Sequence, residues 1–240
     1  MKIPKRFLFA GVFFVLAAAL SYESIVLEYV PVSGILLWLA LDLFLLSIAY
    51  LFNLPQIFGK RSDGSRPFFL AIIWTPWLLT TQLVFWLQNS FSRANVYQKV
   101  AEGLYLGRRC HREELPPDVE VVVDLTAEFV TNKYIYHACD VRCLPVLDGS
   151  VPHDLEEFTR LVTETEHQSR PIYVHCANGS GRGAMFVIAL LLRREVTDNL
   201  DEAINLVTRQ RPQVRLNAEQ YAFLQRAINP SGSQRDALKG

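Results

Sequence analysis

Hydrophobic and polar residues divide the chain into two parts of different character. Residues 1–91 are dominated by Phe, Leu, Ile, Val and Trp, whereas residues 92–229 carry the mixed charge of a water-soluble domain. The three apolar stretches of the first part are 7–22, 29–52 and 68–90. Residues 230–240 are rich in Ser, Gly and charged side chains. The pattern predicts an apolar N-terminal part, a globular domain and a disordered tail.

The apolar stretches predict a multi-pass membrane anchor. The second stretch has the ~20 residues that a helix needs to cross the hydrocarbon core. The first stretch alone could be the apolar region of a signal peptide, but the apolar stretches that follow it favour an anchor. Asp42 is costly at mid-membrane, so we expect it to pair with a polar group on a neighbouring helix.

The third stretch decides on which side of the membrane the globular domain lies. Pro76 interrupts it, and its Trp and Thr residues suit either a kinked span or a helix lying in the membrane interface. Lys60, Arg61 and Arg66 precede it, so the positive-inside rule places residues 59–67 and the N-terminus in the cytoplasm. A spanning third stretch would put the globular domain outside. We favour the interfacial interpretation, which keeps the domain cytoplasmic.

The globular part alternates strand and helix patterns. Continuous or short apolar runs predict strands at 119–125, 142–146 and 171–175, with a further strand or turn at 103–107. Helical spacing predicts helices at 152–166 and 184–194. A third helix is predicted to be capped by Asp198 or Asn199 and to reach Gln210, and a fourth, at 218–228, to be capped by Asn217. Strands that alternate with helices predict a three-layer α/β domain with a largely parallel sheet.

Charge and cysteine content exclude some classes of function. Lys plus Arg and Asp plus Glu number 24 each, so no excess of positive charge indicates a nucleic-acid partner. The four cysteines are Cys110, Cys139, Cys143 and Cys176. They show neither Cys-x-x-Cys nor the Cys/His spacing of a zinc site, so we predict no metal and a reducing compartment.

The segment from His175 to Arg182 carries the candidate chemistry. It follows a predicted strand and opens a helix, so glycine-rich backbone N–H groups and a helix N-terminus would together form a cradle for an oxyanion. The predicted cradle residues are Ala177, Asn178, Gly179, Ser180, Gly181 and Arg182. Cys176 at its mouth would be held as the thiolate, the form that attacks phosphorus. The planar guanidinium of Arg182 could grip two phosphate oxygens.

Other phosphate-binding or cysteine patterns fit this segment less well. Gly179, Gly181 and Gly183 miss the G-x-G-x-x-G spacing of a dinucleotide loop, because residue 184 is Ala. A nucleotide P-loop needs Gly-Lys-Ser/Thr, which this segment does not contain. A buried structural cysteine is a small hydrophobe in a core, and Cys176 is followed instead by small and polar residues.

Cys176-x5-Arg182, preceded by His175, resembles the signature of the protein tyrosine phosphatase superfamily. Residues 104–107, 122–126 and 211–217 also resemble segments of its dual-specificity branch. The resemblance covers about residues 100–228 and does not include the apolar N-terminal part. It implies a three-layer dual-specificity-phosphatase-like fold, a phospho-cysteine intermediate on Cys176 and no cofactor.

The resemblance also implies a general acid, an Asp some thirty residues before the cysteine. Asp148 fits this position and would protonate the leaving oxygen and then activate water. Asp140 and Asp154 are rivals, of which Asp154 is better placed to cap the next helix. His175 is expected to be buried and to orient the loop.

Two further cysteine-loop features lead to predictions. Gly183 occupies the position where this family usually has Ser or Thr, whose hydroxyl helps the thiolate leave in the second step. The second step should therefore be slow and give a pre-steady-state burst. Cys143 could protect Cys176 through a reversible disulfide, although a buried spectator thiol is the simpler interpretation.

Together these features predict a membrane-anchored, cysteine-dependent phosphatase. Its substrates would be phosphotyrosine, phosphoserine or phosphothreonine proteins, or phospholipid headgroups held near the site by the anchor. The alternative is a non-catalytic phosphate-binding module, for which Gly183 is the only support. A sulfurtransferase is more remote, since it has no need of Asp148.

Overall fold

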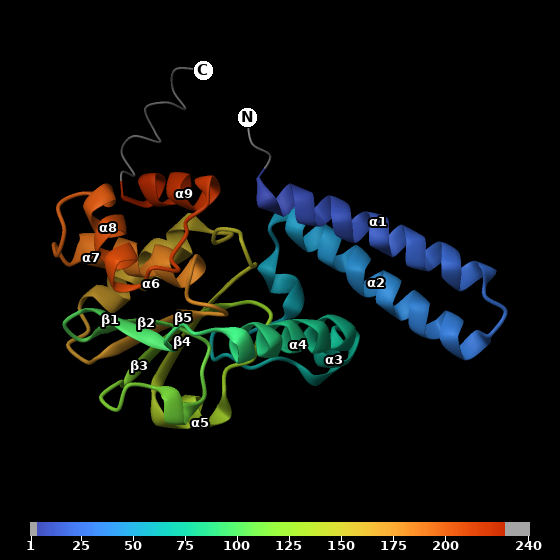
Figure 1. Cartoon of the computed structure of the whole chain (residues 1–240), viewed down its shortest axis with the longest axis horizontal. Helices are drawn as coiled ribbons and strands as arrows, with labels where there is room; N and C mark the ends of the chain where they lie inside the picture. Colours follow the sequence, from blue (N-terminus) through green and yellow to red (C-terminus); the bar gives the residue numbers. More distant parts are fainter. Residues whose placement is uncertain (1–3, 229–240) are drawn as a thin grey trace, which may run out of the picture. The chain divides into compact units, whose positions relative to one another are not determined.

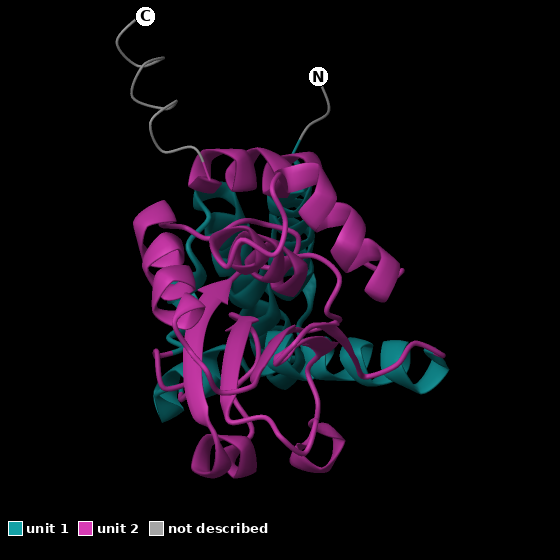
Figure 2. Cartoon of the chain, turned by 90° about the vertical axis from the view of Figure 1, so that its left-hand side faces the viewer, with its two compact units in different colours: residues 1–60, 66–92 teal, residues 61–65, 93–240 magenta. Residues whose placement is uncertain are grey.

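The computed structural model describes residues 4–228, and the chain divides into two compact units (Figure 2). The helical unit comprises residues up to 60 together with 66–92, and the sheet unit comprises 61–65 together with the chain from 93 onward. The predicted tail at 230–240 lies outside the described residues. The short segment 61–65 is therefore part of the sheet unit, although it lies between apolar helices in the sequence.

The helical unit begins with a hairpin of two long helices, α1 (Lys5–Val26) and α2 (Val30–Phe52) (Figure 1). Many of their large apolar side chains are exposed in the isolated chain. At 1.5 Å per residue, each helix is roughly 33–35 Å long, enough for a hydrocarbon core of about 30 Å. Among the described helices, α1 and α2 are the two that are long and apolar enough to cross a membrane.

The third apolar stretch forms two helices rather than one. They are α3 (Phe68–Ile73) and α4 (Thr75–Phe91), which are separated at Trp74. Pro76 lies in the first turn of α4, where its missing N–H is tolerated, but it could not have continued α3. Neither helix contains a buried residue. The proline that suggested a kink therefore marks a helix start.

Asp42 accepts a hydrogen bond from a neighbouring helix, as predicted. Its Oδ2 lies 2.7 Å from the backbone N of Trp77, in the first turn of α4. Trp38 of α2 donates from its indole Nε1 to the carbonyl of Ile73 at 3.1 Å. Two polar side chains of α2 thus satisfy backbone groups on both sides of the break between α3 and α4.

The sheet unit contains a five-stranded sheet in the order β1-β2-β5-β3-β4. Its strands are β1 (Tyr97–Ala101), β2 (Leu104–Arg108), β3 (Val121–Thr126), β4 (Asp140–Val146) and β5 (Ile172–Cys176). β1 and β2 are antiparallel and all other pairs are parallel. Every residue of β3 and β5 is buried, as their apolar runs predicted. The α/β fold with a largely parallel sheet is confirmed.

Helices cover both faces of the sheet and make it the middle of three layers (Figure 1). One face carries α6 (Leu155–Glu166), α7 (Arg182–Arg193), α8 (Leu200–Gln210) and α9 (Ala218–Ile228). The other face carries α5 (Lys133–Ala138). A 3-10 turn, η2 (Arg112–Glu114), follows β2, and another, η1 (Pro55–Phe58), follows α2.

The predicted helices are confirmed with small shifts of their ends. Asp154 caps α6 and Asn199 caps α8 through side-chain oxygens, in agreement with the capping signals. The central helix α7 begins at Arg182, two residues before its predicted start. β1 and α5 were not predicted, because each is short and only partly buried.

Candidate active site

The loop from β5 to α7 turns its carbonyl groups away from Cys176. The backbone N of Arg109 donates to the carbonyls of Cys176 and Ala177, at 2.8 and 3.0 Å. The buried guanidinium of Arg211 donates to the carbonyls of Asn178 and Gly179, at 3.1 and 2.9 Å. The same guanidinium also binds Gln98 Oε1 and Asn95 O, both just before or within β1.

The last two carbonyls of the loop are held in the same way. The backbone N of Arg215 donates to Ser180 O at 2.9 Å, and Met185 N donates to Gly181 O at 2.9 Å as α7 begins. All six successive carbonyls from residue 176 to 181 thus have partners outside the loop. A turn with its carbonyls fixed outward directs amide groups toward its concave side.

The sulfur of Cys176 lies on this concave side. Gly179 N donates to Cys176 Sγ at 3.2 Å, and the cysteine is only 3% exposed. The first turn of α7 has no side-chain cap, so its free N–H groups add to the positive field at the same place. The site therefore gathers hydrogen-bond donors around one sulfur atom.

Gly179 is required by the close approach of this loop to β2. Its φ is +65°, and a Cβ added there would lie 2.3 Å from the carbonyl oxygen of Gly107. Both the left-handed backbone and the contact exclude a side chain. The loop can hold its shape only with glycine at residue 179.

Arg182 is fully buried and anchored by a carboxylate. Its Nη1 and Nη2 donate to the two oxygens of Glu128 at 2.9 and 2.8 Å, a bidentate pair. Nη1 also donates to Val146 O at 2.8 Å, and Nη2 lies 2.9 Å from Asp148 Oδ1. Burial acts to lower the pKa of Arg182, but Glu128 and Asp148 outweigh it and hold the pKa above its ordinary value.

One donor of Arg182 is left over. Its Nε is buried and makes no hydrogen bond to any of the described residues. A buried donor without an acceptor is costly, so this nitrogen is available to an incoming anion. The two terminal nitrogens of Arg182 already bind Glu128, Val146 O and Asp148.

Asp148 is the one of the three candidate acids that faces the loop. Its side chain is 71% exposed and pairs with Arg182. Asp154 caps α6. Asp140 begins β4, at the end of the strand opposite to the site, where it pairs with Arg142 and Arg170.

His175 is buried between a carboxylate and the cysteine loop. Its Nε2 lies 3.9 Å from Asp124 Oδ2, and its Nδ1 lies 3.4 Å from Cys176 O. Asp124 is itself fixed by hydroxyl donors from Thr126, at 2.6 Å, and Thr131, at 2.9 Å. His175 is thus buried, as expected, and its role in orienting the loop stays a prediction.

A comparison with known families identifies the fold around this loop. The family description "dual specificity phosphatase, catalytic domain" matches residues 105–228, more than half of the chain. The chain belongs to the dual-specificity phosphatase family. No curated protein sequence matched the chain.

Solved structures of phosphatases and of a phosphatase-like protein are similar to this chain over somewhat more than half of its length. Tk-PTP in its active form is 23% identical, with 56% of this chain and 97% of that chain covered and a TM-score of 0.49. PTPMT1 in complex with PI(5)P is 18% identical over 58% and 99% of the two chains, with a TM-score of 0.48. The human tyrosine phosphatase-like serine/threonine/tyrosine-interacting protein is 19% identical over 56% and 97%, with a TM-score of 0.48.

Two contributors to this dual-specificity phosphatase site were not predicted as site residues. Glu128 follows β3, and carboxyl ends of neighbouring parallel strands meet at one edge of a sheet, which is the signal that could have found it. Arg211 lies after α8 and reaches the loop from a distant part of the sequence. Only the fold brings Arg211 to the carbonyls of residues 178 and 179.

Gly183 lies behind the loop, in the first turn of α7. A Cβ added there would lie 3.0 Å from Leu106 Cδ1 and 3.5 Å from Cys176 N. The first contact is with the end of a flexible side chain, so a serine fits after a shift of a few tenths of an ångström. The position after Arg182 thus has no hydroxyl, although the structure has room for one there.

A Cys143–Cys176 disulfide does not fit the sheet. All four cysteines are free, and β3 separates β4 from β5. Two strand spacings place the two Cα atoms about 10 Å apart, beyond the ~7 Å limit for a disulfide. The hypothesis of a protective disulfide is therefore wrong for this conformation, and Cys143 Sγ instead lies 3.6 Å from Thr131 Oγ1.

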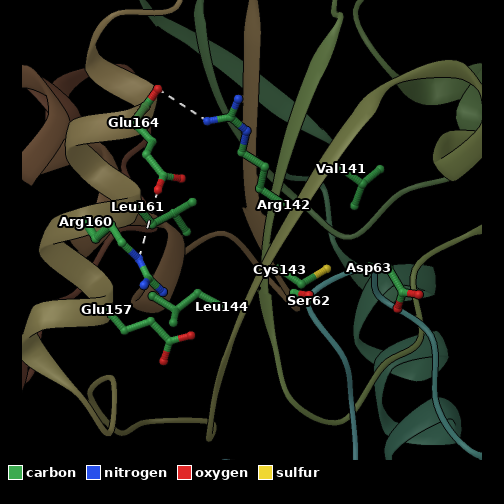
Figure 3. A pocket seen from close by; sticks show the side chains of 10 residues that line it. All are labelled: Ser62, Asp63, Val141, Arg142, Cys143, Leu144, Glu157, Arg160, Leu161 and Glu164. Carbon is green, nitrogen blue, oxygen red and sulfur yellow. Dashed lines mark hydrogen bonds and ion pairs between the residues drawn. The ribbon is translucent and has the colours of Figure 1, made fainter.

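A cavity of about 570 Å³ lies along the open edge of β4, between residues 62–63 and α6 (Figure 3). Arg142 reaches across it to Glu164 O at 3.3 Å, and Arg160 pairs loosely with the Glu164 carboxylate at 4.0 Å. Arg160 and Glu164 are thus the two charged side chains of this cavity that pair with each other across one turn of α6. It does not include Cys176 or Arg182.

Proposed function

We propose that this protein is a membrane-anchored phosphatase that hydrolyses phosphate monoesters through Cys176. The observation that supports this most is the outward fixing of six successive loop carbonyls, which leaves amide donors around Cys176 Sγ. A site rich in fixed donors stabilises negative charge on a phosphoryl group without reorganisation.

In the first step, the phosphoryl oxygens accept hydrogen bonds from the loop amides and from Arg182 Nε. The Cys176 thiolate attacks phosphorus, an S–P bond forms and the P–O bond to the leaving group breaks. The carboxyl group of Asp148, whose side chain is 71% exposed and lies beside Arg182, gives its proton to the leaving oxygen.

In the second step, a water molecule attacks the phospho-cysteine. Asp148 takes a proton from that water, the S–P bond breaks, and the thiolate leaves together with inorganic phosphate. A hydroxyl after Arg182 would stabilise the departing thiolate, and Gly183 provides none. The second step is therefore the slow one in this protein.

The anchor is formed by α1 and α2, both of which are long and apolar enough to cross a bilayer. Lys5, Arg6, Lys60 and Arg61 flank the hairpin on the side of its two ends, whereas Glu23 and Glu28 lie near its turn. The positive-inside rule then places the phosphatase domain in the cytoplasm. The anchor holds the site near lipid headgroups, which raises their effective concentration.

The test is hydrolysis by the full chain in detergent micelles, with Cys176→Ser as the control. A generic aryl phosphate measures the chemistry, and loss of its turnover in Cys176→Ser is the expected result. Comparison of phosphatidylglycerophosphate micelles with a phosphotyrosyl peptide then separates lipid from protein substrates.

A non-catalytic phosphate-binding module is the second candidate, and Gly183 is the observation that favours it. It predicts binding of the aryl phosphate without turnover, identical in the parent chain and in Gly183→Ser. Turnover by the parent chain that depends on Cys176 would eliminate this candidate.

A further inference from the structure

The segment between residues 66 and 92 starts and ends at the sheet unit. Before it, residues 61–65 pair with that unit: Cys143 N donates to Ser62 O at 3.2 Å, and Thr131 N donates to Gly64 O at 3.2 Å. Figure 3 shows Ser62 beside Cys143 on β4. After it, the chain re-enters the sheet unit at Arg93 and forms β1.

A compact water-soluble domain lies on one side of a membrane. Both ends of the 66–92 segment must therefore lie on the same side, and the segment makes either no crossing or two. At 1.5 Å per residue, α3 is roughly 9 Å long and α4 roughly 26 Å. Two crossings of a core of about 30 Å are out of reach for helices of this length.

Within the helical unit, the chain turns beside the middle of α2. Trp77 N at the start of α4 binds Asp42, which is twelve residues after Val30 and ten before Phe52. Ile73 O at the end of α3 binds Trp38 Nε1, which is still further from Phe52. The backbone at the break between α3 and α4 thus lies beside the centre of α2, while the Trp74 side chain reaches from the break to Ile57 O, which follows the end of α2, at 3.0 Å.

We propose that residues 66–92 form a re-entrant hairpin. α3 enters the bilayer from the side of the phosphatase domain, the chain turns at Trp74 near mid-depth, and α4 leaves on the side of entry. The proposal rests on the membrane anchoring proposed above, because mid-depth is defined by α2. It replaces the expectation that this segment lies flat on the membrane surface.

The chemistry of the turn fits a hydrocarbon environment. Broken helices are tolerated at membrane depth only where the freed backbone groups find partners in the protein. Asp42 and Trp38 supply an acceptor and a donor at the break, which gives the costly mid-span carboxylate of α2 a structural purpose.

The outer surface of α3 and α4 is also suited to contact with lipid. Phe68, Leu79 and Phe91 are 80%, 66% and 84% exposed, and neither α3 nor α4 contains a buried residue. The C-terminal turns of α4 carry Trp86 and Asn89, residue types that suit the headgroup level. A bilayer is therefore the partner for this face.

The first test measures sidedness with a membrane-impermeant maleimide on cells that express the full chain. One added cysteine at a time replaces the exposed residues Glu28, Arg61 and Ala94 in a Cys176→Ser background. This background keeps Cys110, Cys139 and Cys143 and serves as the blank. Expected is labelling of Glu28→Cys in intact cells, and of Arg61→Cys and Ala94→Cys only after permeabilisation. Labelling of Arg61→Cys and Ala94→Cys from opposite sides would overturn the proposal.

The second test measures depth with nitroxide labels on the full chain in nanodiscs. Ile72→Cys and Leu79→Cys, on either side of the turn, are compared with Leu37→Cys on α2. Oxygen should broaden all three signals more than a water-soluble nickel complex does. A surface helix would leave the labels at 72 and 79 as accessible to nickel as a label at Phe91, and this result would contradict a re-entrant turn.

The two proposals fail in distinguishable ways. Labelling of Glu28→Cys and Arg61→Cys from one side would remove the spanning α1–α2 pair and, with it, both the anchor and the re-entrant turn. Equal nickel accessibility at residues 72, 79 and 91 would remove the re-entrant turn alone. The phosphatase chemistry is tested separately, by turnover that depends on Cys176. Neither test depends on catalysis, because maleimide labelling and nitroxide accessibility are measured without any turnover of substrate.

Discussion

The helical unit and the sheet unit treat buried polar groups in opposite ways. The sheet unit buries several charged side chains close together, among them Arg182, Arg211 and Asp124, and pairs them around one loop. The helical unit exposes apolar side chains and buries one carboxylate in the middle of a long helix, Asp42. In the sheet unit the buried charged groups hold the cysteine loop in place. In the helical unit the buried carboxylate accepts a hydrogen bond at the break between α3 and α4.

The largest expected effect is a loss of kcat from a change in the sheet unit that a change in the helical unit does not cause. Cys176→Ser should lower kcat for an aryl phosphate by roughly 10⁴-fold or more, since the nucleophile is lost. Asp42→Asn in the helical unit should leave kcat within about twofold. Steady-state rates in micelles compare the two, and an equal loss in both would show that the units are not separable in function.

Stability should depend strongly on the buried pair under the cysteine loop. Glu128→Ala leaves Arg182 buried without its bidentate partner, so the free energy of unfolding should fall by about 3–5 kcal/mol. The exposed Glu113→Ala is the matched control, with an expected change below about 0.5 kcal/mol. Thermal unfolding in detergent measures both, and similar melting temperatures would contradict a structural pair.

Alkaline pH should lower the free energy of unfolding of the sheet unit through ionisation of Cys110. Burial raises the pKa of Cys110 to about 11 from an ordinary value of 9.0. Burial also raises the pKa of Tyr173, which contacts Cys110. A raised folded-state pKa gives stability that is complete below pH 9 and lost as pH rises through 11. The loss should approach about 2–3 kcal/mol, and Cys110→Ala should show a flatter pH profile in unfolding experiments.

The missing hydroxyl after Arg182 should control turnover rather than binding. Gly183→Ser should raise the steady-state rate by roughly tenfold and reduce the pre-steady-state burst of the parent chain. Stopped-flow traces with an aryl phosphate measure both. A parent chain without any burst would show that phospho-cysteine hydrolysis is not the slow step.

The smallest effect should come from the helix break in the helical unit. Asp42→Ala removes the acceptor of Trp77 N and should cost about 1 kcal/mol, as other lost helix caps do. Asp42→Asn retains an oxygen and should cost less. Equal melting temperatures for Asp42→Ala and the parent would show that the turn does not need this acceptor.

The sequence predicted the parts of the molecule that depend on local pattern. Continuous apolar runs identified β3 and β5, and capping residues identified the starts of α6 and α8. The sequence also singled out the loop from Cys176 to Arg182 and Asp148, which the structure brings together through the Arg182–Asp148 pair. Local pattern could not reveal that Glu128 occupies the terminal nitrogens of Arg182, because these residues are far apart in the chain. Nor could composition distinguish a surface helix from the broken pair α3 and α4, since hydrogen bonds to α2 define that turn.

Residues 61–65 have a practical consequence for work on the isolated domain. They lie in the sequence between apolar helices, yet they cover the open edge of β4 by accepting from Cys143 N. A fragment that starts after the last apolar helix would lack this cover and present an unpaired strand to its neighbours. Such a fragment should self-associate, and its oligomers would reflect where the chain was cut rather than a property of the whole protein.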